Sequence, residues 1–337
     1  MGRGIRYALA VLCAAVLLAA LGGAWLAWRL RERPDLSRFD RHLLPAAGPA
    51  TGPRLTATFL GVATVLFSDG ATQIMTDGFF TRVGLADALG DVPVAPDVAA
   101  IERGLARAGA TQLAAVLPVH SHYDHAMDAP EVARRSGALL LGSRTTAWIG
   151  RGGGLPEAQI RVAEPGVPVR FGAFAVTHIP SRHVALPLGQ GSLGVELEAP
   201  LVPPAPVRAW PEGGTWSILI EHPLGSVLVQ GSAGFVEGAL EPYTADVVLL
   251  GVGGLARQGE DYMARYFHEV VEAVGARRVV PIHYDDLTAP SGGPRVPMPR
   301  LLDDVARSLA FLEARAEADP DLELALLPWW EPAVLFP

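Results

Sequence analysis

The sequence contains a single cysteine and no lysine at all. Its single cysteine, Cys13, excludes a disulfide within the chain and a metal site built from several cysteine thiolates. All 27 basic residues are arginines, and 35 acidic residues outnumber them, which gives a net charge of −8. This balance argues against a nucleic-acid-binding protein, which usually presents a basic surface. Half of the residues are hydrophobic, and this fraction excludes a disordered chain.

A long uncharged run near the N-terminus is the first strong pattern. Residues Tyr7–Trp28 carry no charge, and roughly 20 helical residues at about 1.5 Å each cross a bilayer core of about 30 Å. Trp25 and Trp28 stand where an interfacial aromatic belt is expected. Arginines flank the run on both sides, namely Arg3, Arg6, Arg29, Arg31 and Arg33. We therefore predict a single-pass transmembrane helix over residues 7–28.

A cleaved signal peptide is the alternative to an anchor. Its apolar region would be shorter and would end at a small-x-small cleavage site, whereas this run ends in Trp-Leu-Ala-Trp and arginines. An uncleaved anchor is therefore favoured. The flanking arginines are nearly balanced, so the positive-inside rule does not decide the orientation. Because the tail before the run is short and the chain after it is long, we expect the domain that follows it on the extracytoplasmic side of a bacterial membrane.

The rest of the chain divides at about residue 55. Residues 29–54 carry arginines and then Ala, Gly and Pro, which is typical of a juxtamembrane linker. Within 55–337, strand-like and helix-like stretches alternate twice, which predicts an α/β domain of two halves packed as a sandwich with helices outside. The strand-like LELALL is expected to end the chain. Residues 186–214 are rich in Gly and Pro and are predicted to form a lid or binding loop.

A cluster of histidines carries the chemistry. The segment His120-Ser121-His122-Tyr123-Asp124-His125 follows directly on a predicted buried strand, 112–119. Imidazole nitrogens and a carboxylate are the ligands that zinc and similar cations prefer. In an extended backbone His120 and His122 point the same way, and a turn after Tyr123 moves Asp124 and His125 to a neighbouring point. One segment could therefore supply two adjacent metals. The alternative, a solvated polar loop, is disfavoured because chance clustering of this kind is rare.

This motif resembles the His-x-His-x-Asp-His signature of the metallo-β-lactamase superfamily. The longer string HSHYDHAMD is similar to the His-x-His-Tyr-Asp-His-x-x-Asp variant of one branch. That branch contains N-acyl-phosphatidylethanolamine phospholipase D and ascorbate-6-phosphate lactonase. The resemblance covers residue 55 to the C-terminus. It implies an αββα sandwich, in agreement with the organisation described above.

The resemblance also implies roles for residues elsewhere in the chain. Asp77, in MTDG, resembles the family's strand-end aspartate, which supports the metal loop. His183, in IPSRH, and His283, in VVPIHYD, resemble the two later ligands. Asp124 would orient the attacking water as well as bind metal. The implied ligand sets are His120, His122 and His183 for one metal, and Asp124, His125 and His283 for the second.

Three further side chains are ambiguous. His178 competes with His183 as a ligand, but it lies within a predicted strand, and a core or supporting role is favoured. Asp128 either braces the metal loop or serves only as the N-cap of the following helix. His222, beside a predicted hairpin turn, is expected at the surface.

Ser232 departs from the family pattern. The resemblance implies an aspartate that bridges the two metals, but the matching segment VLVQGSAGF has Ser232 there. A neutral hydroxyl is a weak ligand and cannot neutralise two cations. Three interpretations remain, namely a mononuclear enzyme, a dinuclear enzyme with an open bridge, and a protein that has lost the usual activity. A working site with one or two Zn²⁺, or another divalent metal, is favoured.

These features predict a membrane-anchored metal-dependent hydrolase. A bound cation lowers the pKa of water from 15.7 to about 7, which provides hydroxide to attack an ester, a lactone or a phosphodiester. The anchor and the apolar segment LEAPLVPPAPVRAW fit a lipid-like substrate as well as a small molecule. The alternative is a non-catalytic or altered metal-binding protein on a degenerate hydrolase fold, given Ser232. No nucleic-acid partner is expected.

Overall fold

Apolar runs of the chain form two seven-stranded sheets that face each other. The computed structural model describes residues 2–49, 52–185 and 192–337. The strands of the first sheet, in spatial order, are β16 (Pro332–Phe336), β1 (Leu55–Gly61), β2 (Thr64–Ser68), β3 (Gln73–Thr76), β5 (Leu113–Leu117), β6 (Leu139–Gly142) and β7 (Ile160–Val162). Those of the second are β15 (Glu323–Leu324), β14 (Arg278–Ile282), β13 (Val247–Gly251), β12 (Gly225–Gln230), β11 (Thr215–His222), β9 (Phe174–Ser181) and β8 (Val169–Phe171).

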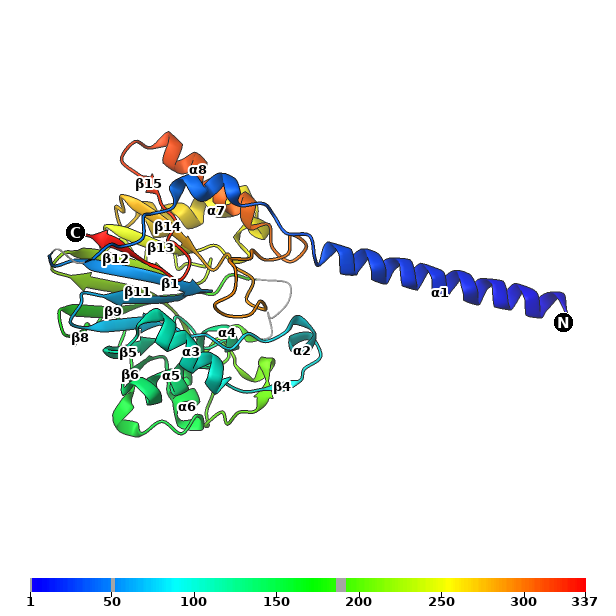
Figure 1. Cartoon of the computed structure of the whole chain (residues 1–337), viewed down its shortest axis with the longest axis horizontal. Helices are drawn as coiled ribbons and strands as arrows, with labels where there is room; N and C mark the ends of the chain where they lie inside the picture. Colours follow the sequence, from blue (N-terminus) through cyan, green and yellow to red (C-terminus); the bar gives the residue numbers. More distant parts are fainter. Residues whose placement is uncertain (1, 50–51, 186–191) are drawn as a thin grey trace.

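Helices cover the outer face of each sheet (Figure 1). The first sheet carries α3 (Val98–Ala108), α5 (Ala129–Ser136) and α6 (Arg144–Gly152), and the second carries α7 (Glu260–Phe267) and α8 (Val305–Ala318). The side chain of Asp97 caps the N-terminus of α3, and Gly109, at φ +65°, ends the helix. The arrangement is the predicted αββα sandwich.

The largest hydrophobic cluster fills the space between the sheets and under the helices of the second sheet. The central parallel strands β13 and β14 contribute Val and Leu on both faces, and β13 is buried along its whole length. Such continuous apolar runs are expected for strands covered on both sides. Because these strands are held from both faces, the loops at their C-terminal ends start from rigid positions.

Shorter elements complete the domain. They are α2 (Leu85–Leu89), β4 (Pro93–Val94), α4 (Tyr123–Ala126), η2 (Glu157–Gln159), β10 (Ala205–Pro206), η4 (Val207–Ala209), η5 (Leu255–Gln258) and the single π-turn η6 (His268–Glu272). In the predicted lid, residues 186–191 lie outside the described residues. The remainder of that segment includes β10, which pairs with β4 in a separate two-stranded sheet.

The C-terminal strand was predicted in the wrong place. Only Glu323–Leu324 of LELALL forms a strand, β15, at the edge of the second sheet. The chain then crosses to the other sheet, where β16 pairs antiparallel with β1. The sequence signal was weak because β16 begins at Pro332, which has no N–H for a ladder.

The N-terminal helix α1 (Arg3–Arg29) projects from the sandwich (Figure 1). It has a mean hydropathy of 2.4 over its most apolar stretch, and none of that stretch is buried against the domain, so it is long and apolar enough to cross a membrane. The following residues, within the predicted linker, contact the domain. A 3₁₀ helix, η1 (Ser37–His42), buries Phe39 completely, and Arg41 and His42 pair with Glu313 of α8.

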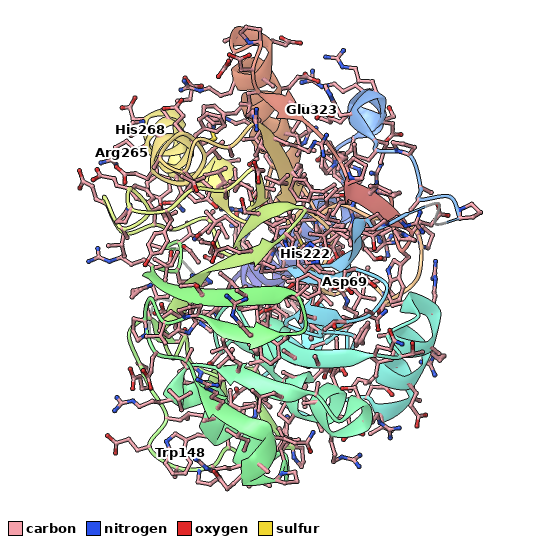
Figure 2. The ribbon with its side chains drawn as sticks, turned by 90° about the vertical axis from the view of Figure 1, so that its left-hand side faces the viewer. Asp69, Trp148, His222, Arg265, His268 and Glu323 are labelled. Carbon is pink, nitrogen blue, oxygen red and sulfur yellow. The ribbon has the colours of Figure 1, made fainter. Side chains whose placement is uncertain are left out.

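His222 was wrongly predicted to be a surface residue. It ends β11 at the opposite end of the strands from the histidine cluster, and its side chain is only 7% exposed. Its ring packs on Phe174, and its Nε2 lies 3.4 Å from Asp69 Oδ2 (Figure 2). The hairpin turn alone did not reveal that the first sheet covers this end of the second.

Candidate metal centre

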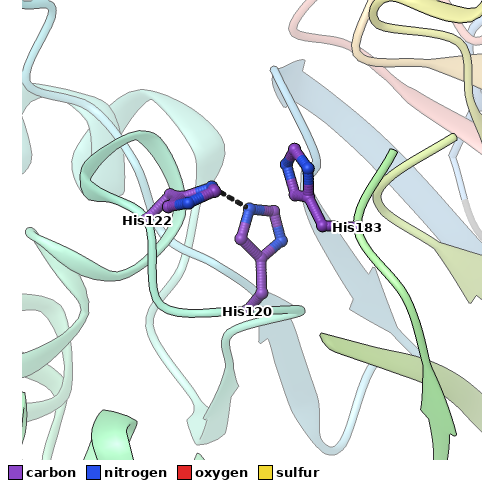
Figure 3. A group of neighbouring side chains, drawn as sticks. All are labelled: His120, His122 and His183. Atoms are coloured by element: carbon purple, nitrogen blue, oxygen red, sulfur yellow. Dashed lines mark hydrogen bonds between the residues drawn. The ribbon is translucent and has the colours of Figure 1, made fainter. Parts of the chain in front are cut away.

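Three histidines from two segments meet at one edge of the sandwich (Figure 3). His120 and His122 follow β5, and His183 follows β9 of the facing sheet. His120 Nε2 lies 3.0 Å from His122 Nδ1, and the His183 ring centroid is 4.7 Å from both other rings. One nitrogen from each ring falls within 4.8 Å of the other two. We call His120, His122 and His183 the first triad.

The surroundings of the first triad favour the neutral form of its three imidazoles. Burial lowers the pKa of His120 well below its usual value and that of His122 to about 3, and the neighbouring imidazoles add to the effect. Burial also lowers the pKa of His183. The Nδ1–H of His183 donates to Val184 O at 2.7 Å, which leaves Nε2 as the nitrogen with the lone pair. At neutral pH all three rings can therefore offer lone pairs to a cation.

Asp124, His125 and His283 form the second triad. Asp124 and His125 lie in the short helix α4, and His283 follows β14 in the facing sheet. Asp124 Oδ2 lies 3.4 Å from His125 Nε2 and 3.6 Å from His283 Nε2. One ligand atom from each of the three residues lies within 4.8 Å of the others. The ring centroids of His120 and His125 are 3.9 Å apart, so the two triads are adjacent.

Unlike the first triad, the second contains opposite charges. Although burial opposes it, the histidines His125 and His283 hold the pKa of Asp124 well below its usual value. Burial also lowers the pKa of His125, but Asp124 and Asp77 outweigh it and raise that pKa to about 10. In the metal-free protein Asp124 and His125 thus form a buried ion pair.

Asp77 supports this segment as the resemblance implies. It is completely buried, and its Oδ2 lies 2.7 Å from His125 Nδ1, an arrangement that orients a metal-binding imidazole. Its Oδ1 accepts a hydrogen bond from Val119 N at 2.9 Å, so it also holds the backbone just before His120. Asp77 itself has φ +53°, which aspartate tolerates better than most residues.

Asp128 holds the loop at Phe80 and Thr81 rather than the metal-binding loop itself. Its side chain makes no capping bond to α5, and its Oδ2 instead accepts from Phe80 N at 2.8 Å and Thr81 N at 2.6 Å. It therefore holds the loop that follows Asp77. Burial raises the pKa of Asp128 to about 6, although the hydrogen bonds from Thr81 and Phe80 act in the opposite direction.

Ser232 and His178 are placed beside the centre in different ways. Ser232 Oγ accepts a hydrogen bond from Val184 N at 3.0 Å, so it positions the residue next to His183. Nearby, a Cβ on Gly234 would lie 2.2 Å from Arg182 O, so this approach requires glycine. His178 belongs to neither triad. It is buried in β9 against Trp216, and desolvation lowers its pKa to about 3.

Sequence reasoning missed the support of His283. Asp285 Oδ1 accepts from Val62 N at 2.7 Å, and Val62 O accepts from His283 N at 2.7 Å. The guanidinium of Arg82 lies 3.3 Å from Asp285 Oδ2. His283 has φ +59°, and a Cβ on Gly253 would lie 2.7 Å from its ring. The acidic pair Asp285-Asp286, which begins two residues after His283, was the signal available in the sequence.

The residues present fit a divalent cation. The first triad gathers imidazole nitrogens with no carboxylate among them, and His120 Nδ1 is buried without a hydrogen-bond partner among the described residues. Neutral imidazoles brought this close need a cation or protons between them. The second triad adds the carboxylate and two imidazoles that a second cation would use. The six side chains fall into the two sets that the resemblance implies.

Sequence comparison relates the chain to metal-dependent hydrolases. No protein-family model matches it. A UPF0173 metal-dependent hydrolase of Pyrobaculum neutrophilum is 29% identical over 175 residues, and one of Pyrobaculum islandicum is 27% identical over 173 residues. In both comparisons the match spans 50% of this chain and 64% of the relative's length. The chain thus covers somewhat less than two thirds of the relatives it matches.

Solved structures share the fold at low sequence identity. The diiron β-hydroxylase CmlA of Streptomyces venezuelae aligns with a TM-score of 0.51 and 12% identity over 86% of this chain and 55% of its own. A possible metal-dependent hydrolase of Veillonella parvula aligns with a TM-score of 0.50 and 12% identity over 84% of this chain and 100% of its own. These likenesses concern the fold alone, and they confirm the predicted αββα sandwich.

Proposed function

We propose that the chain is a membrane-anchored, metal-dependent hydrolase whose centre is formed by the two triads. The observation that carries the proposal is the convergence of His120 and His122 with His183, and of Asp124 and His125 with His283, across the two sheets. The naming of its relatives as metal-dependent hydrolases supports the same reaction class. Zinc is the proposed metal because neutral imidazoles with one carboxylate suit it. The structural likeness to a diiron enzyme makes iron the competing candidate.

Each triad has a distinct task in this proposal. A bound divalent cation supplies Lewis acidity and a nucleophile at neutral pH. The first triad holds that cation without adding charge, and His183 is oriented for the task by Val184 O and, through Val184 N, by Ser232. The ionised Asp124 is placed to orient the attacking nucleophile. Asp77 fixes the ring of His125 and thereby the position of the whole motif.

The substrate is proposed to be an ester, a lactone or a phosphodiester with an apolar part. Exposed apolar side chains occur on the segments around α2, β4 and β10, namely Leu89, Val92, Val195 and Val202. In Figure 1, α2 and β4 lie toward the side of the domain from which α1 projects. A substrate taken from a membrane surface would meet these side chains first. This favours a lipid-like substrate over a soluble one, and with it the branch that contains N-acyl-phosphatidylethanolamine phospholipase D.

Anchoring through α1 is the second part of the proposal. The helix ends at Arg29, and the domain holds the residues just beyond it. Arg33 Nη1 lies 2.6 Å from Asp286 Oδ2 and donates to Pro297 O at 2.8 Å, and Glu32 O accepts from Arg300 N at 3.0 Å. The helix is therefore fixed beside the loop that follows His283 rather than joined to it by a loose tether.

Metal content and turnover of the full-length protein in detergent test the reaction class. We expect one or two zinc ions per chain by elemental analysis, and hydrolysis of at least one member of a panel of lactones, bis-p-nitrophenyl phosphate and phospholipids. Stripping the metal should abolish that hydrolysis, and adding zinc should restore it. Bound metal without turnover of any panel member would favour the alternative of an altered metal-binding protein, which Ser232 supports. Iron with oxidase activity would contradict the hydrolase proposal.

Deletion of residues 1–30 tests the anchor. The truncated chain keeps the contacts of Glu32 and Arg33, so we expect it to remain folded and to leave the membrane fraction. The full-length chain should stay in the membrane pellet at high salt and be released only by detergent. A truncated chain that still sediments with membranes at high salt would contradict a single N-terminal anchor.

A further inference from the structure

A cavity of about 420 Å³ lies outside the metal centre, between α3 and the loop that follows His283. We call it the arginine pocket. Its lining includes Phe80, Arg82, Arg103, Arg107, Ser291 and Trp330. Three of these residues are arginines in a chain whose net charge is −8. The proposed reaction has no use for this cavity, so its composition needs another explanation.

Three residues that line the arginine pocket each carry a buried hydrogen-bond donor without a partner. Arg82 Nε, Trp330 Nε1 and Ser291 Oγ are all buried and have no hydrogen-bond partner among the residues that the structure describes. The Arg82 side chain is only 4% exposed, and Trp330 is 5% exposed. A buried donor without a partner costs roughly 1–3 kcal/mol. The three donors lie in the wall of one cavity, and no described residue of that wall offers them an acceptor.

The charges around the pocket specify the sign of that acceptor. Arg103 has no ion-pair partner within the described part of the chain, and Arg107 lies over the Trp330 ring and donates to Gly292 O. Asp97 is the one acidic residue of the lining, and its carboxylate already accepts from Ala100 N as the cap of α3. The free groups are thus cationic or donors, and none of them is an unengaged carboxylate.

We propose that the arginine pocket binds a small organic anion, a phosphate or carboxylate with an apolar or aromatic body. Its charged group pairs with the exposed Arg103 and Arg107, and its body fills the rest of the cavity. Arginine suits this task because its planar fork matches both oxyanions. The volume excludes a macromolecule and allows a ligand of ordinary metabolite size.

The pocket also communicates with the metal centre through a short chain of contacts. The guanidinium of Arg82, whose Nε faces no partner, pairs with Asp285. Asp285 holds Val62, which in turn accepts from His283 N. An anion in the pocket therefore fixes the loop 285–292 and the segment that carries His283. Protection of this loop is a consequence that can be measured directly.

Calorimetric titration of the full-length protein in detergent tests the proposal. The probes are phenylphosphonate, which a hydrolase cannot cleave, and benzoate, with neutral benzyl alcohol as the matched control. We expect saturable binding of at least one anion and none of the alcohol. The double variant Arg103→Ala/Arg107→Ala should bind at least about tenfold more weakly, because two charge-assisted contacts are lost. Arg161→Ala, which removes an exposed arginine on β7, should bind as the unmodified protein does.

Two further measurements separate the arginine pocket from the metal centre. The variant His122→Ala should bind the anion with unchanged affinity, and Arg103→Lys should retain most of the binding that Arg103→Ala loses. Hydrogen exchange should slow in α3 and in residues 286–293 when phenylphosphonate is bound. Binding that disappears in His122→Ala, or protection confined to residues 120–125, would place the anion at the metal and overturn the proposal. Absence of saturable binding of both anions would overturn it as well.

Discussion

The two triads lie side by side, but they favour different charge states of their side chains. The first triad is three imidazoles whose pKa values are lowered, so it has lone pairs ready and no charge of its own. In the second triad the ionised Asp124, together with Asp77 behind it, raises the pKa of His125 to about 10, so this imidazole holds a proton tightly. A cation that enters the second triad must therefore compete with the proton on His125, whereas the first triad presents neutral imidazoles.

We expect this difference to let the chain bind a cation with Ser232 at the position where the resemblance implies a bridging aspartate. The first triad needs no bridge to bind one cation. The second lacks the extra negative charge that would favour a second cation over the His125 proton. We therefore expect the first triad to be the tight site and the second to be the weak one.

Removing a ligand of the first triad should have the largest effect. We expect His122→Ala to lower metal-dependent turnover by roughly three orders of magnitude or more, because the tight site loses a ligand. The fold should survive, since the His122 side chain makes no capping bond to α4. Turnover and metal content measure the loss of the site, and thermal unfolding measures whether the fold survives. His268→Ala, which removes an exposed histidine paired with Glu272, is the control. Unchanged turnover in His122→Ala would remove the first triad from the mechanism.

A substitution behind the second triad should act mainly on that site. Asp77→Asn keeps a side chain that tolerates the positive φ but loses the charge opposite His125. Loss of such an orienting carboxylate commonly lowers metal affinity by about 10–100-fold. We expect the second equivalent of metal to be lost in a chelator competition while the first is retained. Equal weakening of both equivalents would show that the triads do not act as separate sites.

Restoring a carboxylate at residue 232 should strengthen the second site. We expect Ser232→Asp to raise the metal content from about one towards two ions per chain, because a carboxylate at the bridging position that the resemblance implies would stabilise two cations. The new side chain can still accept from Val184 N. Ser232→Ala, which loses the acceptor and adds no charge, is the matched control. If Asp and Ala give the same metal content, residue 232 is not the bridging position.

The comparison of the triads also shows what the sequence could reveal. Four of the six residues lie in one contiguous motif that directly follows a buried strand. The local sequence pattern was therefore enough to predict these four. His183 and His283 are isolated residues that were placed only through the family resemblance. The supporting contact between Arg82 and Asp285 joins residues 203 positions apart, and no local pattern indicates it.

The fold was predictable to a similar depth. Buried strands such as β5 and β13 and the capped helix α3 carry strong local signals. The edge strand β16 does not, because it begins with proline and pairs with a strand at the far end of the chain. Burial of Phe39 is likewise a long-range effect, since its neighbours in sequence are charged.

The smallest expected effect concerns Asp128, which holds the loop behind the second triad and touches neither triad itself. Its pKa is about 6 in the folded protein, against 3.8 for the group without a shift, so the folded state binds the proton more tightly than the unfolded state. The free energy of unfolding should therefore fall as the pH rises from about 4 to about 6, by at most about 3 kcal/mol from this group. Asp128→Asn keeps one acceptor for Phe80 N and Thr81 N and has no proton to lose. Denaturant unfolding at pH 4.5 and pH 7 should show that the variant loses less stability over this interval than the unmodified protein does. Parallel pH profiles of the free energy of unfolding for the two proteins would mean that Asp128 is ionised over the whole interval. Protonation of this carboxyl would then not contribute to the stability of the loop behind the second triad.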